Sequence, residues 1–193
     1  MIRELPIPAS RSGQDAGVPE SSAAEAAFDA AFTALFEAHF RRLFRYLDRL
    51  SGEPDLAADL AQEAYVRLYR RGAMPDVPQA WLVTVALNLF RNARASRSRR
   101  RSLVGLVRGE LAQADPAPAP DAGLLAAEER HAVRAALEQL PERDRRLLLL
   151  RSEGYSYREI AAALRLHEAS VGVFLARARR AFRAACEGGT HAS

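Results

Sequence analysis

The chain has 193 residues, a formal net charge of +4 and an isoelectric point of about 9.8, and all 28 of its basic residues are arginine. A single cysteine, Cys186, excludes an intrachain disulfide framework and a metal site built from cysteines. No apolar run is long enough for a membrane span or a hydrophobic signal core. The composition predicts a cytoplasmic, all-α protein made of two small helical domains, without membrane insertion.

The first part of the chain predicts a disordered tail and one long helix. Residues 1–24 contain proline, serine and glycine without an apolar period, which is typical of a disordered tail. From Glu25 to Leu50 apolar residues recur at three- and four-residue steps, which is the pattern of an amphipathic helix. The sequence Ser51-Gly52-Glu53-Pro54 is expected to end this helix.

A second helix is predicted from Asp55 to Arg71, and it carries an acidic face. Asp55, Asp59 and Glu63 are four residues apart, so they share one side, where like charges repel by roughly 0.2–0.5 kcal/mol per pair. Such a face is either well solvated or meets a basic partner, and the residues alone favour solvation. No histidine, cysteine or nucleophile joins these carboxylates, so an enzyme and a metal site are disfavoured and no cofactor is expected.

A third helix is predicted from Pro78, a favourable first-turn residue, to Arg101. Trp81 is expected on its core face. The stretch from Arg91 to Arg101 holds six arginines and no acidic residue, which is an electrostatic footprint for a polyanion such as nucleic acid. The alternative is a solvated, fraying helix end.

A change of composition divides the chain into two domains. Residues 102–123 include the proline- and alanine-rich run Asp115–Pro120 and predict a flexible linker. The expected domains are therefore residues 25–101 and residues 124–187, with a short tail at 188–193.

The second domain predicts a helix-turn-helix. Ser156 and Glu159 have the spacing of a capping box at the start of a helix. A short turn at Arg165-Leu166 and a helix that ends in several arginines follow. A plain four-helix bundle without a ligand is the alternative, but the cap, the turn and the arginines favour contact with DNA.

Both halves resemble one family, in four segments. Asp59-Leu60-Ala61-Gln62-Glu63 is similar to the polymerase-binding segment of sigma factors, and Pro78 to Arg101 is similar to their segment that reads and melts the minus-ten element. Leu140 to Arg145 is similar to the opening of their domain four, and Tyr155 to Arg180 is similar to their helix-turn-helix for the minus-thirty-five element. Over residues 25–185 the chain resembles the extracytoplasmic-function (ECF) group of the bacterial sigma-70 family.

The resemblance implies a non-catalytic initiation factor and assigns three groups of residues. The factor would bind promoter DNA and the beta-prime and beta subunits of core RNA polymerase, and many relatives are held by an anti-sigma factor. The polymerase-binding group is Asp55, Asp59, Gln62 and Glu63. The minus-ten group is Asn88, Arg91, Arg94 and Arg97. The minus-thirty-five group is Tyr157, Arg158, Glu168, Ser170, Val173, Phe174, Arg177, Arg179 and Arg180.

The recognition region departs from the family pattern. Arg165 stands where glycine is usual, and a non-glycine residue at positive φ costs on the order of 1 kcal/mol. His167 replaces a serine and is a weaker helix cap. Ser170–Phe174 lacks the usual lysine and arginine, and its Gly172 weakens a helix by roughly 1 kcal/mol relative to alanine.

These departures leave two interpretations of the recognition helix open. The favoured one is weak or altered promoter recognition, in which Val173 or Phe174 touches thymine methyl groups. In the other, Phe174 faces a protein.

Two other functions remain alternatives for the whole chain. One is a helix-turn-helix transcriptional regulator that acts without replacing the sigma subunit, although the N-terminal half lacks the strand–helix alternation of a receiver domain. The other is an adaptor whose basic helices bind only protein.

Overall fold

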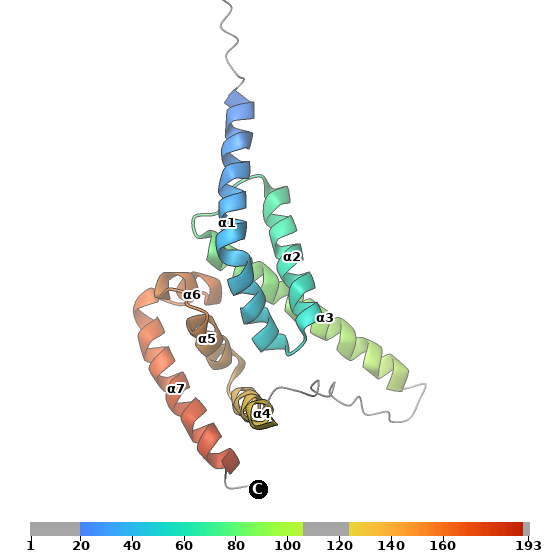
Figure 1. The fold of residues 1–193 in the computed structure, drawn as a ribbon, viewed down its shortest axis with the longest axis vertical. Coiled ribbons are helices and arrows are strands. Elements are labelled where there is room, and N and C mark those ends of the chain that lie inside the picture. Colours follow the sequence, from blue (N-terminus) through green and yellow to red (C-terminus); the bar gives the residue numbers. More distant parts are fainter. Residues whose placement is uncertain (1–19, 106–123, 191–193) are drawn as a thin grey trace, which may run out of the picture.

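The computed structural model describes residues 20–105 and 124–190, and within them the chain forms seven helices and no strand (Figure 1). The all-α prediction is therefore confirmed. The predicted disordered tail falls almost entirely outside the described residues, as do most of the linker and the last three residues. The helices are α1 (Glu20–Ser51), α2 (Pro54–Arg71), α3 (Pro78–Gly105), α4 (Leu124–Glu138), α5 (Glu142–Ser152), α6 (Tyr157–Leu164) and α7 (Glu168–Thr190).

Helices α1 to α3 form the first unit, which packs around leucine, alanine and valine side chains. Leu43, Leu47, Leu68 and Val83 are almost completely buried between the three helices. Tyr65 of α2 belongs to this core and is 3% exposed. Phenylalanines of α1 surround its ring, and its hydroxyl donates to a backbone carbonyl of α1 at 3.4 Å, so the buried polar group is satisfied.

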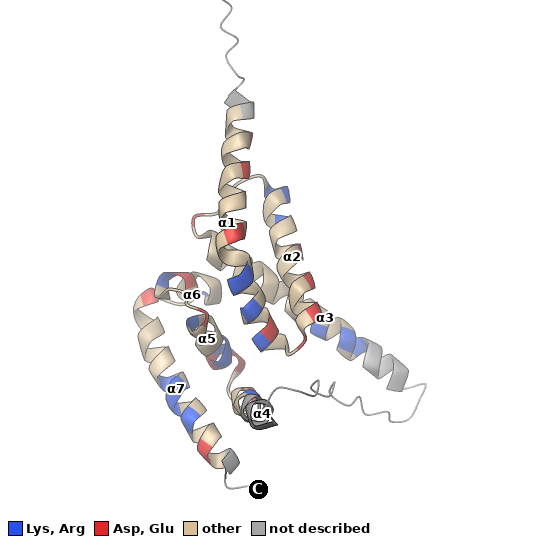
Figure 2. Cartoon of the chain, in the orientation of Figure 1, with Lys and Arg blue, Asp and Glu red and all other residues tan. Residues whose placement is uncertain are grey.

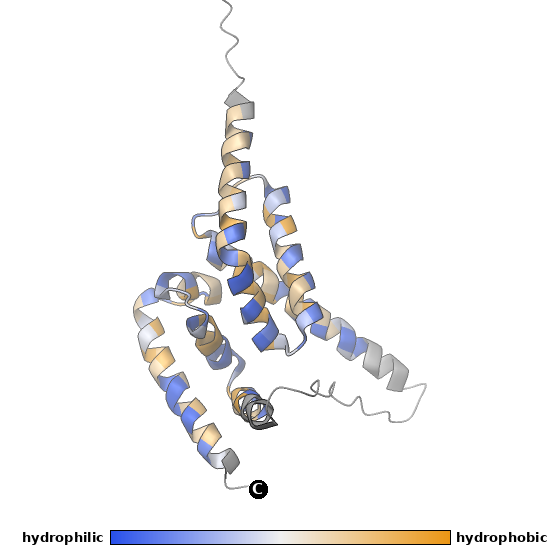
Figure 3. Ribbon diagram, viewed as in Figure 1, coloured by the Kyte–Doolittle hydropathy of each residue, from blue (hydrophilic) through white to orange (hydrophobic). Residues whose placement is uncertain are grey.

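Helices α4 to α7 form the second unit, with the helix-turn-helix in α6 and α7. Its core contains Leu147, Leu150, Ile160 and Leu175, all fully buried. Hydrophobic and hydrophilic residues mix along each helix, as amphipathic elements require (Figure 3).

Three helices are longer than the sequence predicted. Helix α1 begins at Glu20, α3 continues to Gly105, and α7 continues to Thr190. The added turns contain little apolar residue periodicity, so a criterion based on a buried stripe misses them, and those of α3 and α7 also include glycine, a poor helix former.

The two units touch each other. Helix α1 contacts α5, and α3 contacts α6, so the helix-turn-helix lies beside the first unit (Figure 1). A flexible linker predicts separable domains, but it does not predict this packing.

Candidate polymerase and DNA interfaces

The acidic residues of α2 lie on an exposed face that also carries apolar side chains. Asp55, Asp59 and Gln62 are exposed, and Val66 and Tyr69 continue the same stripe at helical spacing, 39% and 53% exposed. The two apolar residues were not predicted as part of this face, although steps of four and three residues from Gln62 lead to them. An exposed stripe with an acidic end and an apolar end suits a protein partner better than simple solvation does.

Glu63 lies beside that stripe and has a partner in its own helix. Its Oε1 accepts a hydrogen bond from Arg67 Nε at 2.8 Å, in the i, i+4 relation. This pair offsets part of the repulsion among the α2 carboxylates, so the acidic face is less costly than the sequence suggested.

The four polar residues assigned to the minus-ten group of α3 do not share one face. Asn88, Arg91 and Arg94 are exposed along one side, and Asn88 accepts a hydrogen bond from Arg91. Arg97 lies nine residues after Asn88, half a turn round the helix, and pairs with both oxygens of Glu53 in the α1–α2 turn at 2.5 and 2.6 Å. The hydrogen bond from Glu53 raises the pKa of Arg97.

Trp81 lies on the core side of α3, as predicted. Its side chain is half-buried against the first unit's core, and the guanidinium carbon of Arg71 lies 5.9 Å from the ring centroid. Trp81 therefore helps to hold α3 against the core of the first unit.

The helix-turn-helix begins with the predicted capping box. The Glu159 N–H donates to Ser156 Oγ at 3.2 Å, and the Ser156 N–H donates to Glu159 Oε2 at 2.7 Å. Burial alone would raise the pKa of Glu159, but the hydrogen bonds from Ser156 and from Arg42 of α1 lower it. The cap therefore fixes the start of α6 and holds the carboxylate charged.

The turn between α6 and α7 adopts the strained conformation predicted from Arg165. This residue has φ 55° and ψ 51°, and its N–H donates to the Ala161 carbonyl. Among the described residues it is the one non-glycine residue with positive φ. The left-handed geometry of a helix end is thus kept without glycine.

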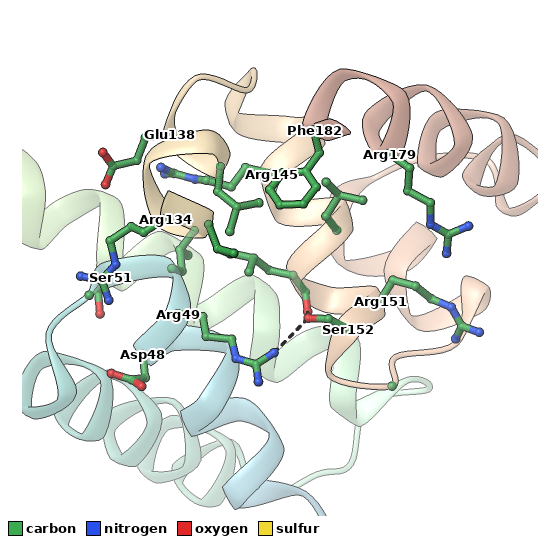
Figure 4. A pocket seen from close by; sticks show the side chains of 17 residues that line it. Asp48, Arg49, Ser51, Arg134, Glu138, Arg145, Arg151, Ser152, Arg179 and Phe182 are labelled. Atoms are coloured by element: carbon green, nitrogen blue, oxygen red, sulfur yellow. Dashed lines mark hydrogen bonds between the residues drawn. The ribbon is translucent and has the colours of Figure 1, made fainter. Parts of the chain in front are cut away.

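Only some of the residues assigned to the minus-thirty-five group lie on the exposed surface of α7. Val173 is 70% exposed and shares a face with Arg177 and Arg180. Arg179 lies on another side, where it lines a groove against α1 (Figure 4). Of the remaining assigned residues, Tyr157, Arg158 and Glu168 are exposed and Ser170 is half-buried.

Phe174 packs against its own unit. Its ring lies between Arg143 and Arg177, whose guanidinium carbons are 4.6 and 5.6 Å from the centroid, and it contacts the core. Arg177 also pairs with Asp144, a buried carboxylate of α5, at 3.2 Å. These contacts hold α7 on α5, so Val173 is the more available apolar side chain of the two.

The described ranges, 20–105 and 124–190, lack two kinds of feature. They contain no group of three or more histidine, cysteine, aspartate or glutamate residues placed to hold a metal ion. They also contain no helix long and apolar enough to cross a membrane.

Comparison with known proteins assigns both units to one family. Residues 35–100 match the family described as Sigma-70 region 2, and residues 130–182 match Sigma-70, region 4. The ECF RNA polymerase sigma factor EcfG of Rhodopseudomonas palustris (strain TIE-1) is 35% identical over 139 residues, which cover 68% of this chain and 70% of that protein. The chain belongs to the ECF group of the sigma-70 family.

Two further relatives show how far the similarity extends. The probable RNA polymerase sigma factor RfaY of Xanthomonas campestris pv. campestris is 37% identical over 138 residues, 67% of this chain but only 34% of that longer protein. The sigma factor RpoE of Bartonella quintana, solved in complex with the anti-sigma factor NepR, has the same fold, with a TM-score of 0.58 at 22% identity over 81% of this chain and 97% of that chain. Membership confirms the family predicted from the sequence, whose members direct transcription initiation.

The contacts between the two units of this sigma factor were not predicted from the sequence. They join arginines of α1 to glutamates of the second unit, and the residues are Arg42, Arg45, Arg49, Glu153 and Glu159. The three arginines recur at steps of three and four residues, and this spacing is the signal in the sequence that they share one face of a helix.

Proposed function

We propose that the chain binds core RNA polymerase through the exposed face of α2 and directs it to promoters through α3 and α7. Residues 25–101 would act as the sigma domain that docks on the beta-prime subunit and opens the minus-ten region, and residues 124–187 as the domain that contacts the minus-thirty-five element. The observation that carries the proposal is the exposed stripe from Asp55 to Tyr69 inside the stretch that matches region 2. The factor would work in the cytoplasm, without catalytic activity of its own.

The minus-ten contact would use Asn88, Arg91 and Arg94. Their side chains form a polar, cationic track, which suits the backbone of an opened strand. Arg97 is engaged by Glu53, so we assign it a weaker part: it orients the end of α3 and adds positive charge nearby.

This chain would bind the minus-thirty-five element more weakly than a factor whose recognition helix is rich in lysine and arginine. Val173 offers an apolar surface to thymine methyl groups, while Arg177 and Arg180 contact phosphates, which contribute affinity but not sequence choice. Tyr157, Arg158 and Ser170 lie at the start of the two helices and would contact the neighbouring backbone, whereas the Glu168 carboxylate would face base edges rather than phosphates. By analogy with the Bartonella factor, an anti-sigma factor is a further proposed partner.

The test is reconstitution with core polymerase. Asp59→Arg reverses a charge at the centre of the α2 face and should weaken binding to core polymerase by about tenfold or more, since central interface residues carry most of the binding energy. Glu187→Arg makes the same charge change at an exposed position of α7 and should leave binding unchanged. If Asp59→Arg forms holoenzyme and supports run-off transcription as well as the parent, the assignment of α2 is wrong.

A further inference from the structure

A row of arginines on α1 meets two glutamates of the helix-turn-helix unit. Arg42 Nη2 lies 2.8 Å from Glu159 Oε1. Arg45 Nε and Arg49 Nη1 each lie 2.7 Å from an oxygen of Glu153, whose side chain is only 2% exposed. Figure 2 shows basic residues in the C-terminal half of α1, the helix that contacts α5. One buried carboxylate is thus held between two cations of the other unit.

Aromatic rings fill the centre of this contact. Tyr155, between α5 and α6, is 2% exposed, and the Arg42 guanidinium carbon lies 3.9 Å from its ring centroid. Tyr46 of α1 is fully buried and meets Tyr155 edge-on at 6.3 Å. Burial raises the pKa of Tyr155 to about 12, so the ring remains neutral at physiological pH. The stacked arginine and the paired rings make this a fitted interface.

Two smaller contacts lie on either side. Thr84 Oγ1 of α3 is 3.4 Å from the Ala163 carbonyl of α6. At the other end, Arg49 Nη1 donates to Ser152 Oγ at 3.3 Å beside a groove of about 970 Å³ (Figure 4). The Arg134 guanidinium of α4 lies so close to Gly52 that a side chain there would collide with it. The two units therefore meet along a continuous line.

The interface contains buried polar groups that are incompletely satisfied. Within the described ranges, five buried side-chain atoms lack a hydrogen-bond partner, and all belong to residues at or next to this boundary: Arg42 Nε, Tyr46 Oη, Arg145 Nε, Arg146 Nε and Glu153 Oε1. Glu153 Oε1 has its ion pair with Arg49 but no aligned hydrogen bond. Buried polar groups without partners weaken the contact between the units, even though buried apolar side chains of both units form one cluster.

The packed arrangement is incompatible with binding both promoter elements. Positions minus ten and minus thirty-five are about 25 base pairs apart, which at 3.4 Å per base pair is roughly 85 Å. In the packed chain α3 contacts α6, and a small groove is lined both by Asn88 and Arg91 and by Arg165 of the helix-turn-helix. Residues proposed to contact the opened strand therefore face the second unit.

We propose that Arg42, Arg45 and Arg49, with Glu153 and Glu159, form an interdomain latch that holds the unbound factor closed and inactive. Opening of the latch frees the minus-ten face of α3 and lets the second unit reach the distant element. The significance of the latch rests on the proposed function, but its existence can be measured without polymerase.

The test is charge reversal and charge exchange in the full chain. Arg45→Glu and, separately, Glu153→Arg place like charges in contact and should increase the open fraction by about tenfold or more. Arg41→Glu is the matched control, because Arg41 is exposed on the same helix outside the contact and should leave the open fraction unchanged. A triple exchange, Arg45→Glu with Arg49→Glu and Glu153→Arg, restores opposite charges and should close the molecule again.

The distance between the units is measured by energy transfer between a dye on exposed Cys186 and a second dye on Arg70→Cys, with the radius of gyration from small-angle scattering as an independent measure. Circular dichroism of each variant verifies that the helices remain folded. If both single reversals leave the distance unchanged, or if the exchange fails to close chains that the single reversals opened, the latch is refuted.

A cross-linked variant connects the latch to function. Cysteines at Thr84 and Ala163, joined by a short thiol cross-linker in a Cys186→Ser background, should abolish transcription, while the same variant without the cross-link should retain it. Full activity of the cross-linked chain would refute inhibition by closure. Absence of transcription with the parent chain would instead count against the proposed function and leave the energy-transfer result standing.

Discussion

Replacement of Gly172 by alanine tests how the recognition helix is built. Gly172 lies inside α7, where glycine is about 0.8–1.0 kcal/mol less favourable than alanine. A Cβ at this position would lie 3.5 Å from Tyr157 Cε2 and 3.9 Å from the Tyr157 hydroxyl oxygen, which are ordinary van der Waals contacts. Because nothing must move, Gly172→Ala should stabilise the second unit by about 1 kcal/mol, or about 4–8 °C in the Tm of a unit of this size.

Gly154 provides a control, because the same substitution to alanine is expected to lower the stability there instead of raising it. It has φ +85°, and a Cβ there would meet nothing within 4 Å, so the change tests backbone strain alone. Gly154→Ala should destabilise the same unit by about 1–2 kcal/mol, because a left-handed conformation is unfavourable for alanine.

The measurement must report on one unit, since a chain of two units need not unfold in a single step. Amide hydrogen exchange along α5 to α7, followed at several denaturant concentrations, gives the local opening free energy. Stronger protection in Gly172→Ala and weaker protection in Gly154→Ala are expected. Weaker protection in Gly172→Ala would show that Tyr157 crowds this position, and the reasoning from the free space around it would be wrong.

Three further predictions concern the recognition unit and the first unit. Val173→Arg adds a cation to the exposed face of α7 and should strengthen binding to duplex DNA, with the slope of log K against log salt steeper by about 1 in filter-binding or anisotropy titrations; an unchanged slope would remove this face from the DNA contact. Arg165→Gly should relieve the positive φ and stabilise the second unit by about 1 kcal/mol in the same exchange measurement, whereas Arg165→Ala, which keeps the strain, should not. Burial, with the charge of Arg42, lowers the pKa of His39, whose Nε2 accepts a hydrogen bond from Gln79. The folded state therefore binds the proton less readily than the unfolded chain, so stability should fall as the pH drops below about 6.5, and His39→Gln should reduce that loss in urea titrations at pH 7.5 and 5.5.

The features that were predictable from the sequence are those set by neighbours along the chain. Ser156 and Glu159 form the capping box because a cap depends on residues three apart, and Arg165 adopts positive φ because a helix must end there. The separation of Asn88 and Arg97 around α3 could also have been predicted, since nine residues correspond to two and a half turns, but the assignment of both residues to one minus-ten group concealed it.

What could not be predicted depends on how separate segments meet. Glu153 is an ordinary charged residue in the sequence, and only the packing of α5 on α1 makes it a buried carboxylate between two arginines. The position of Phe174 is of the same kind, because its ring is covered by Arg143 from another helix. Helical periodicity gives the face of a residue but not the partner that covers it.

Glu159 performs two tasks with one carboxylate. One oxygen closes the first turn of α6 through Ser156, and the other binds Arg42 of the opposite unit. A substitution that weakens the grip between the units at this position also frays the first helix of the DNA-contacting motif. Loss of Glu153 would loosen the contact between the units and leave the cap of α6 intact. Loss of Glu159 would loosen the same contact and also destabilise the motif. Evolution can therefore adjust the balance between closed and open chains more freely at Glu153.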